Sequence, residues 1–432
     1  MGNFKFSMRM LKKEYKKSLV YTLTLALVTA VTFLFFNIID NPHLMDAPQQ
    51  TSQWFYTQMP FSTMLSFLII VFCAFMIVFA NNFYVSRKTD EIAIMTMSGS
   101  TFINVTLYLI YQNIVMTFIA FIIGVILGSG ISMCVNQFIY SYIHYQGAFF
   151  YIPMNAIFDT IICILAILFG QLVYTSGFVY RKDISYLLSQ EKTNISQDER
   201  IFKFPSWIYI VIYLFGVVSL VMSYNSVSAI FPCFIGSMGI GCMIKYNFPK
   251  LFHIMKSKKW LADKLKLISL SNLYYSLRRA YILVGLYAVS SSVMIAIMIM
   301  QKDNPRELIT AFIGFIVVTI LILASIIYKY VMEATTRKLF YYNLYKMGYT
   351  YRQLKAIIKQ EVIYFYSLLF GLPMVIIILS LIQAYLHQDI TIHFMIMILA
   401  VQIISDIVAC VFTYIAYKKN VLKVLEEGVR YE

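Results

Sequence analysis

The chain has 432 residues, of which 60% are hydrophobic and only 13% are charged. Soluble domains carry about 25% charged residues, and the apolar residues here form unbroken runs near about 20 residues, the length of a helix that crosses a bilayer. Composition therefore excludes a soluble protein, and solid runs rather than alternating ones exclude a closed barrel. We predict an all-α polytopic membrane protein.

The apolar runs predict ten transmembrane helices. In chain order they cover approximately residues 18–39, 61–84, 105–133, 155–180, 205–223, 227–245, 281–300, 308–331, 360–385 and 391–417. Only a few residues near Tyr224 and Asn225 join the fifth and sixth spans, so these two should form a tight hairpin. The first run is too long for a cleavable signal peptide and lacks a small-residue cleavage site, so we expect it to stay as an anchor.

The basic residues predict the orientation of these spans. If both termini lie on one side, all but two of the chain's 35 Lys and Arg residues fall on that side, and only Lys302 and Arg306 fall on the other. The positive-inside rule then places both termini in the cytoplasm. The net charge of +15 therefore needs no nucleic-acid partner. Two interpretations of the basic clusters near residues 8–17 and 256–266 stay open: contact with anionic membrane lipids, or a topology signal alone.

The chain contains an internal repeat. Residues 84–105 and 333–354 share a pattern of basic pair, amphipathic turns, glycine, polar turn and long apolar run. Aligning Gly99 with Gly348 gives an offset of 249 residues and leaves the two Arg-Lys pairs one position out of register.

A second pair of segments extends the repeat to the start of the chain. Residues 10–27 resemble residues 272–289, since both are basic, amphipathic and continuous with a span. The repeat predicts two four-helix units, at 1–180 and 246–432, related by a pseudo-twofold axis along the membrane normal. Residues 181–245 then form a linker and a central two-helix hairpin.

The repeated cytoplasmic segments are either idle loops or short helices that bind something. Two idle loops could both keep a basic pair for topology, but they would not both need apolar residues before a glycine. Such residues in a cytoplasmic segment favour a groove to fill, and a glycine suits a left-handed helix end. The apolar residues are Ile92, Ile94, Met95 and Met97 in the first copy, and Leu339, Phe340, Leu344 and Met347 in the second.

The stretch "RKTDEIAIMTMSGS", followed by a long span with Gly124 and Gly128, resembles the FtsX-like permease family of bacterial ATP-binding-cassette (ABC) transporters. The ten-span arrangement is similar to that of the bacitracin-resistance (Bce-type) permeases. The resemblance implies that residues 88–100 and 337–349 are coupling helices that dock into a separate ATPase, with two ATPase copies for each permease. The implied coupling residues are Arg87, Lys88, Glu91, Ile92, Met95, Gly99, Arg337, Lys338, Leu344, Met347 and Gly348.

The chain departs from the Bce type in two places. Those permeases carry a large extracellular domain between the seventh and eighth spans, where this chain has only "QKDNPREL". Phe340 also stands in the second copy where the first has Glu91. The first departure affects peptide recognition and the coupling to a sensor histidine kinase that the resemblance implies.

The sequence contains no phosphate-binding G-x-x-x-x-G-K-[ST] loop and no hydrolase or metalloprotease motif. We therefore expect no enzyme activity, catalytic residue, metal site or cofactor on this chain. ATP and Mg²⁺ would be bound by the partner ATPase.

Three polar residues are predicted within or at the edge of the spans: Asp406, Gln171 and Glu361. A carboxylate inside a span costs about 2.5 kcal/mol or more, so Asp406 should face a partner or water. It either forms part of a polar path or hydrogen-bonds a neighbouring helix, through Gln171 or a serine. Glu361 should pair with a nearby lysine or meet the ATPase.

The leading functional hypothesis is an ABC permease that exports or removes antimicrobial peptides or other amphiphilic or lipid-linked compounds. The alternative is a signalling or scaffold permease that regulates a sensor kinase or a cell-wall enzyme. A secondary transporter is disfavoured, since it would need several intramembrane ionisable residues.

Overall fold

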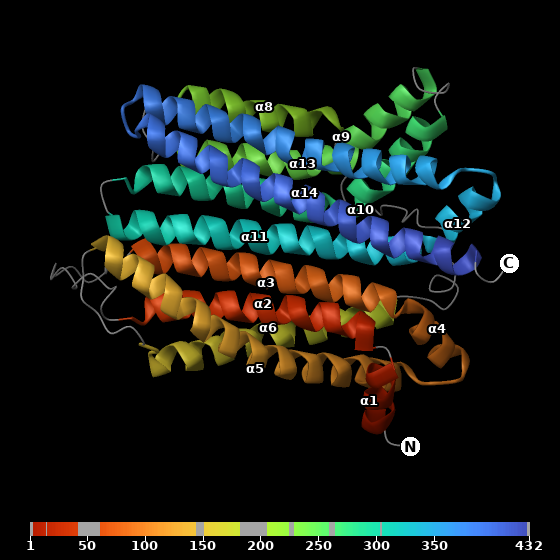
Figure 1. Ribbon diagram of the computed structural model, residues 1–432. Helices are drawn as coiled ribbons and strands as arrows, with labels where there is room; N and C mark the ends of the chain where they lie inside the picture. Colours follow the sequence, from red (N-terminus) through yellow and green to blue (C-terminus); the bar gives the residue numbers. More distant parts are fainter. Residues whose placement is uncertain are drawn as a thin grey trace. The chain divides into compact units, whose positions relative to one another are not determined.

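The computed structural model describes residues 3–13, 15–41, 61–143, 151–181, 205–223, 229–258, 264–302 and 305–429. All regular secondary structure in these ranges is helical, which confirms the all-α prediction. The chain divides into two compact units, Met1–Phe202 and Lys203–Glu432. Figure 1 labels the helices of each unit.

The first unit is a bundle built around one central helix. Its helices are α1 (Asn3–Lys13), α2 (Tyr15–Ile39), α3 (Phe61–Arg87), α4 (Thr89–Met97), α5 (Phe102–Ile143) and α6 (Met154–Arg181). The central helix α2 packs against α3, α5 and α6. The short helix α1 lies across the end of the bundle and contacts α2 and α5 (Figure 1).

Close approach of α2 and α5 depends on glycine. A Cβ atom at Gly124 would lie 2.6 Å from Cβ of Thr29 and 2.8 Å from the carbonyl oxygen of Ala26. One turn on, a Cβ atom at Gly128 would lie 2.9 Å from the carbonyl oxygen of Ala30. This pair of glycines four residues apart therefore allows backbone contact between helices, as small residues do in membrane bundles.

The second unit repeats this helix order and includes the predicted hairpin. Its helices are α8 (Trp207–Val221), α9 (Ile230–Lys258), α10 (Lys264–Met300), α11 (Pro305–Thr336), α12 (Lys338–Lys346), α13 (Tyr351–Leu386) and α14 (Ile392–Val429). The most buried span is on α10, which packs against α9, α11 and α13. The hairpin helices α8 and α9 meet where Gly216 faces Gly236, and α8 also contacts α13.

Eight helices of the described residues are long and apolar enough to cross a membrane. They are Tyr21–Ile39, Leu65–Asn82, Phe102–Ser141, Met154–Tyr180, Ala280–Met300, Glu307–Val331, Tyr351–Leu386 and Ile392–Val421. They correspond to predicted spans one to four and seven to ten. In the hairpin, α8 has only 15 residues, fewer than the about 20 that a span needs. The hairpin residues Tyr224 and Asn225 lie outside the described residues, and the count of ten stays a prediction there.

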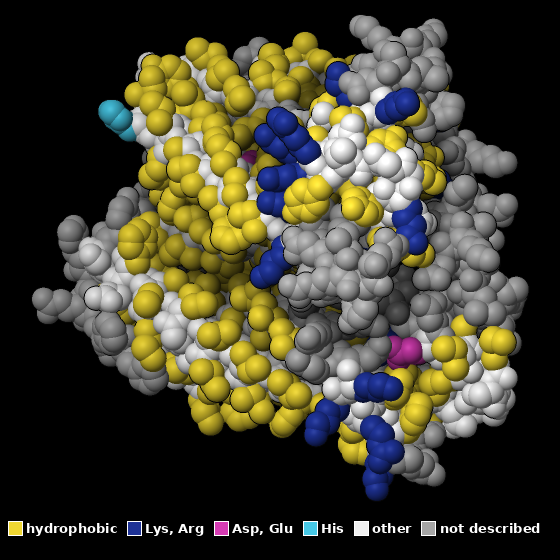
Figure 2. Space-filling view, turned by 45° about the vertical axis from the view of Figure 1, so that its right-hand side comes forward, with side chains coloured by type: hydrophobic (Ala, Val, Ile, Leu, Met, Phe, Trp, Pro, Cys, Tyr) yellow, Lys and Arg dark blue, Asp and Glu magenta, His cyan; other side chains and the backbone are white. Residues whose placement is uncertain are grey.

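The surface of the bundles is suited to lipid. Large apolar side chains on α5 and α6, such as Ile126, Phe158 and Phe169, are more than half exposed. Figure 2 shows hydrophobic side chains covering broad areas of the face in view, with Lys and Arg confined to limited parts of it. Because apolar side chains in such numbers would be costly in water, the chain is a multi-pass membrane protein.

Candidate functional site

Each unit has a short helix between two long ones, and both short helices begin in the same way. Lys88 separates α3 from α4 with φ −86° and ψ 4°, and Arg337 separates α11 from α12 with φ −88° and ψ 1°. These two residues are 249 positions apart, the offset that also relates Gly99 to Gly348. The structure therefore aligns Lys88 of the first Arg-Lys pair with Arg337 of the second, so the two pairs remain one position out of register. We call Lys88 with α4 the first junction and Arg337 with α12 the second junction.

Both short helices end in the predicted glycine turn. Gly99 has φ 86° and Gly348 has φ 94°, values that residues with a side chain rarely adopt. The amide of Ser100 donates to the carbonyl of Met95 at 3.1 Å, and the amide of Tyr349 donates to that of Leu344 at 3.2 Å. These six-to-one bonds define a Schellman motif at each helix end. The prediction that glycine ends both helices is confirmed.

At the first junction, a buried cation connects the helices. The side chain of Lys88 is only 2% exposed, and its Nζ donates to both carboxylate oxygens of Glu91 at 2.9 Å. The Oη of Tyr108 on α5 donates to Glu91 Oε2 at 2.6 Å. The Nζ of Lys88 also lies 5.8 Å from the ring centroid of Tyr84 on α3. Short bonds to a charged acceptor are strong, so Glu91 links α4 firmly to α5.

At the second junction, four charges form a buried network. The Arg337 guanidinium donates to Glu361 Oε1 at 2.7 Å and also to Glu333. The Nζ of Lys329 lies 2.9 Å from Glu333 Oε2. The hydroxyl of Ser276 on α10 donates to Glu333 and Glu361, at 3.1 Å each. The network therefore joins α12 to α10, α11 and α13 at once.

Charge balance stabilises this network. Burial opposes the charged form of Arg337, but Glu333 and Glu361 outweigh it and hold the pKa of Arg337 well above its usual range. Burial, with the nearby negative charge, likewise raises the pKa of the Tyr341 phenol on α12 well above its usual range. The phenol donates to Glu361 Oε2 at 3.4 Å. Two cations and two carboxylates thus cancel in a site where an unpaired charge would be costly.

The junction helices divide their predicted coupling residues between the interior and the surface. Ile92 and Leu344 are buried within their own units, so they face the bundle, contrary to the expectation that both could fill a partner's groove. The most exposed apolar side chains are Ile94 (65%), Met97 (65%), Leu339 (68%) and Met347 (76%). Met95 and Lys338 are half-buried, and the side chain of Arg87 lies outside the described residues. Whether these residues contact a partner stays a prediction.

Asp406 lies deep in the second unit and is buried. The Oη of Tyr287 on α10 donates to Asp406 Oδ1 at 2.6 Å. The amide of Gln402, one turn earlier on α14, donates to both Tyr287 and Asp406. The hydrogen-bond partners of Asp406 are therefore Tyr287 and Gln402, in place of the predicted Gln171 or serine. Sequence reasoning missed both because neither is charged. The carboxylate links α14 to α10.

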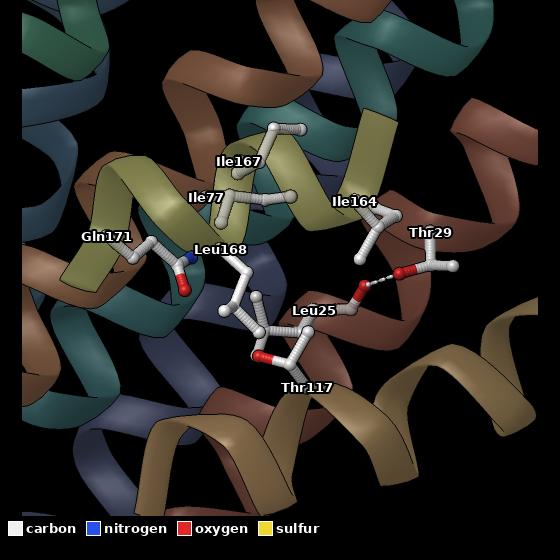
Figure 3. A pocket seen from close by; sticks show the side chains of 8 residues that line it. All are labelled: Leu25, Thr29, Ile77, Thr117, Ile164, Ile167, Leu168 and Gln171. Atoms are coloured by element: carbon white, nitrogen blue, oxygen red, sulfur yellow. Dashed lines mark hydrogen bonds between the residues drawn. The ribbon is translucent and has the colours of Figure 1, made fainter. Parts of the chain in front are cut away.

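Gln171 instead belongs to the first unit, where it borders a small cavity. Figure 3 shows side chains from α2, α3, α5 and α6 around it, with Gln171 at one side. The cavity is about 10 Å³, at the lower limit of the space that holds one water molecule. Gln171 Oε1 and Thr117 Oγ1, both lining it, have no hydrogen-bond partner among the described residues.

Comparison with known proteins gives three matches. Residues 63–184 match the family described as "FtsX-like permease C-terminal". The chain is 24% identical over 307 residues to the bacitracin export permease protein BceB of Halalkalibacterium halodurans, and 21% identical over 309 residues to BceB of Bacillus subtilis. Each alignment covers 67% of this chain and 46% of the relative, so the chain spans about half the length of the curated relatives it matches. These matches confirm the predicted resemblance, and residues 63–184, which contain the first junction, are similar to an FtsX-like permease region.

Proposed function

We propose that this chain is the membrane permease subunit of an ABC transporter and that a separate ATPase chain binds ATP and Mg²⁺. One observation supports this most directly. The two units present short helices with matching ends, and each is joined to a span through a charged residue: Glu91 accepts from Tyr108 of α5, and Arg337 pairs with Glu361 of α13. A helix attached in this way can pass movement from a docked partner to the spans.

Each junction combines an exposed apolar surface with a buried link. Ile94 and Met97 on α4, and Leu339 and Met347 on α12, are the side chains available to a partner's groove. Buried apolar anchors can contribute about 2 kcal/mol or more to an interface. Glu91 and Arg337 then carry the movement inward. Two junctions imply two ATPase copies for each permease.

The transported compound is proposed from the relatives. Both are named bacitracin export permeases, so we propose that this chain exports or removes antimicrobial peptides or amphiphilic, lipid-linked compounds, and so confers antimicrobial peptide resistance. It would do so in the bacterial plasma membrane, with both termini in the cytoplasm, as the distribution of basic residues predicts.

The second candidate is a signalling permease that regulates a sensor histidine kinase or a cell-wall enzyme. The same junctions would serve it. Only residues 301–304 separate α10 from α11, so an extracellular domain is not inserted there. Any contact with a peptide or a kinase would have to use other parts of the protein.

Co-purification tests the proposal. The chain would be expressed with an ABC ATPase from the same organism, and ATP turnover would be measured in membranes. Leu339→Asp/Met347→Asp and Ile94→Asp/Met97→Asp should release the ATPase or abolish its stimulation. The control variants Leu339→Met/Met347→Leu keep both positions apolar and should retain it. If both Asp variants keep the ATPase and normal turnover, the junctions are not docking sites.

A further inference from the structure

The helix α1 is amphipathic in both sequence and placement. Lys5, Arg9 and Lys12 are spaced four and three residues apart, so they lie on one face of the helix, and all three are exposed. Phe4 (54% exposed) and Phe6 (36% exposed) lie on either side of this face, and their rings also contact Tyr111 and Tyr108 of α5. A helix with a cationic face beside partly exposed aromatic side chains is suited to the interface between lipid headgroups and acyl chains.

The orientation of α1 fits such an interface. The helix lies across the end of the bundle, whereas α2, α3, α5 and α6 run along it (Figure 1). Since those helices cross the membrane, α1 runs along its surface. In Figure 2, Lys and Arg side chains gather beside hydrophobic ones at the bottom of the view, where α1 lies in Figure 1.

One route of contacts runs from α1 to the first junction through Tyr108. The ring of Phe6 lies 5.7 Å from the ring of Tyr108 on α5, centroid to centroid. The Oη of Tyr108 donates to Glu91, which holds Lys88. A change in the position of α1 therefore reaches the α4 carboxylate through a single tyrosine.

A second route runs through the α1 backbone. The amide of Gln112 on α5 donates to the carbonyl oxygen of Ser7 at 3.4 Å. Gln112 Oε1 in turn accepts from Tyr84 Oη at 2.9 Å, and the ring of Tyr84 lies beside Lys88. The two routes converge on the ion pair that begins α4.

The second junction is connected differently. There α10 continues from Lys264 into its span as one helix, and the junction is joined to it through Ser276 and the charges of Glu333 and Glu361. The described residues of the second unit include no separate surface helix before the span. Among the described residues, only the first junction is connected to a surface helix, through the contacts of α1 with α5.

We propose that α1 binds anionic lipid headgroups and that this binding stabilises α4 through Tyr108, so that the first junction responds to the charge of the inner membrane surface. The proposal goes beyond the proposed function, because the interaction does not require an ATPase. Each cation close to an anionic surface changes affinity by about fivefold. Three cations together then change the affinity of α1 for such a surface by about a hundredfold.

Hydrogen exchange on the full-length chain tests this proposal. The chain would be placed in vesicles of phosphatidylcholine alone, or of phosphatidylcholine mixed with phosphatidylglycerol. Anionic lipid should slow amide exchange in α1, and in α4 by about fivefold or more, the usual lower range of coupling between sites. Added salt should reduce both effects, because it screens exposed charges.

Three variants separate the steps. Lys5→Gln/Arg9→Gln/Lys12→Gln should lose the lipid effect in both α1 and α4. The control Arg352→Gln/Lys355→Gln/Lys359→Gln removes equal charge from the second unit, also on the predicted inner side, and should keep it.

Tyr108→Phe retains the ring against Phe6 but removes the hydroxyl. It should keep the lipid effect in α1 and reduce it in α4, where only the route through Gln112 and Tyr84 remains, with unchanged exchange in α6 showing an intact bundle. The proposal is overturned if anionic lipid does not change amide exchange in α4 of the unmodified chain, in which case the basic cluster is a topology signal alone. It is also overturned if the triple variant or Tyr108→Phe keeps the full α4 response. No ATPase is present, so failure here is distinct from failure of the proposed function.

Discussion

Replacing Arg337 by methionine should destabilise the second unit strongly. The variant keeps most of the side-chain volume but leaves Glu333 and Glu361 with only Lys329 as a buried cation. Removing one partner from a buried ionic network typically costs about 3–5 kcal/mol, because the remaining charge is uncompensated. We expect a loss in that range, measured by unfolding the purified protein in a denaturing-detergent titration followed by circular dichroism.

The first junction offers a comparison of smaller size. Lys88→Met removes the cation beside Glu91, but the Glu91 side chain is already partly exposed to water and still accepts a hydrogen bond from Tyr108. The cost should therefore be about 1–3 kcal/mol, the value for one unsatisfied polar group. The exposed control Arg352→Met should change stability by less than about 0.5 kcal/mol.

A double variant tests the cause. Arg337→Met/Glu361→Gln removes one cation and one carboxylate, so it leaves Lys329 paired with Glu333. It should be more stable than Arg337→Met alone by about 1 kcal/mol or more, since neighbouring charges are not additive. The charge-balance argument is refuted if Arg337→Met is as stable as the unmodified protein, or if the second substitution destabilises further.

Three further substitutions have expected outcomes in the same unfolding assay. Gly124→Ala should lose about 1–3 kcal/mol of stability, the cost of overpacking, because its Cβ would lie 2.6 Å from Thr29 of α2. The control Gly130→Ala should not lose stability, because its Cβ would meet nothing within 4 Å. Equal stability of the two variants would contradict the close approach of α5 to α2. Gly348→Ala should lose about 1–2 kcal/mol through its left-handed backbone, and no loss would mean that the turn adapts. Asp406→Asn keeps an oxygen that accepts a hydrogen bond from Tyr287, so stability should change by less than about 1 kcal/mol. ATP turnover by the complex should also persist. Loss of turnover in an assembled complex would show that the negative charge of Asp406 is needed.

Much of this protein could be predicted from local sequence because the membrane imposes local rules. A run of about 20 apolar residues must form a helix, since lipid cannot satisfy its backbone. Gly99 and Gly348 mark helix ends because few other residues tolerate a positive φ. Both features depend on the residues themselves and need no knowledge of distant contacts.

The junctions' connections could not be predicted in this way. Lys329 lies near the end of the predicted span 308–331 and Glu333 lies just after it, positions typical of charges at a membrane boundary. Both are nevertheless buried, because α10 and α13 bring Ser276 and Glu361 to them. A helix of nine residues is also too short for its apolar pattern to show which side faces the bundle.

Sequence alone therefore determined the helical class, the repeat and the places where the short helices end, each of which follows from local chemistry. Tertiary structure decided that Leu344 faces inward and Met347 outward, and that Asp406 bonds to Tyr287. It also decided which residue begins each junction. The physical reason is that a buried charge is stable only beside its partners, and those partners come from helices far apart in the chain.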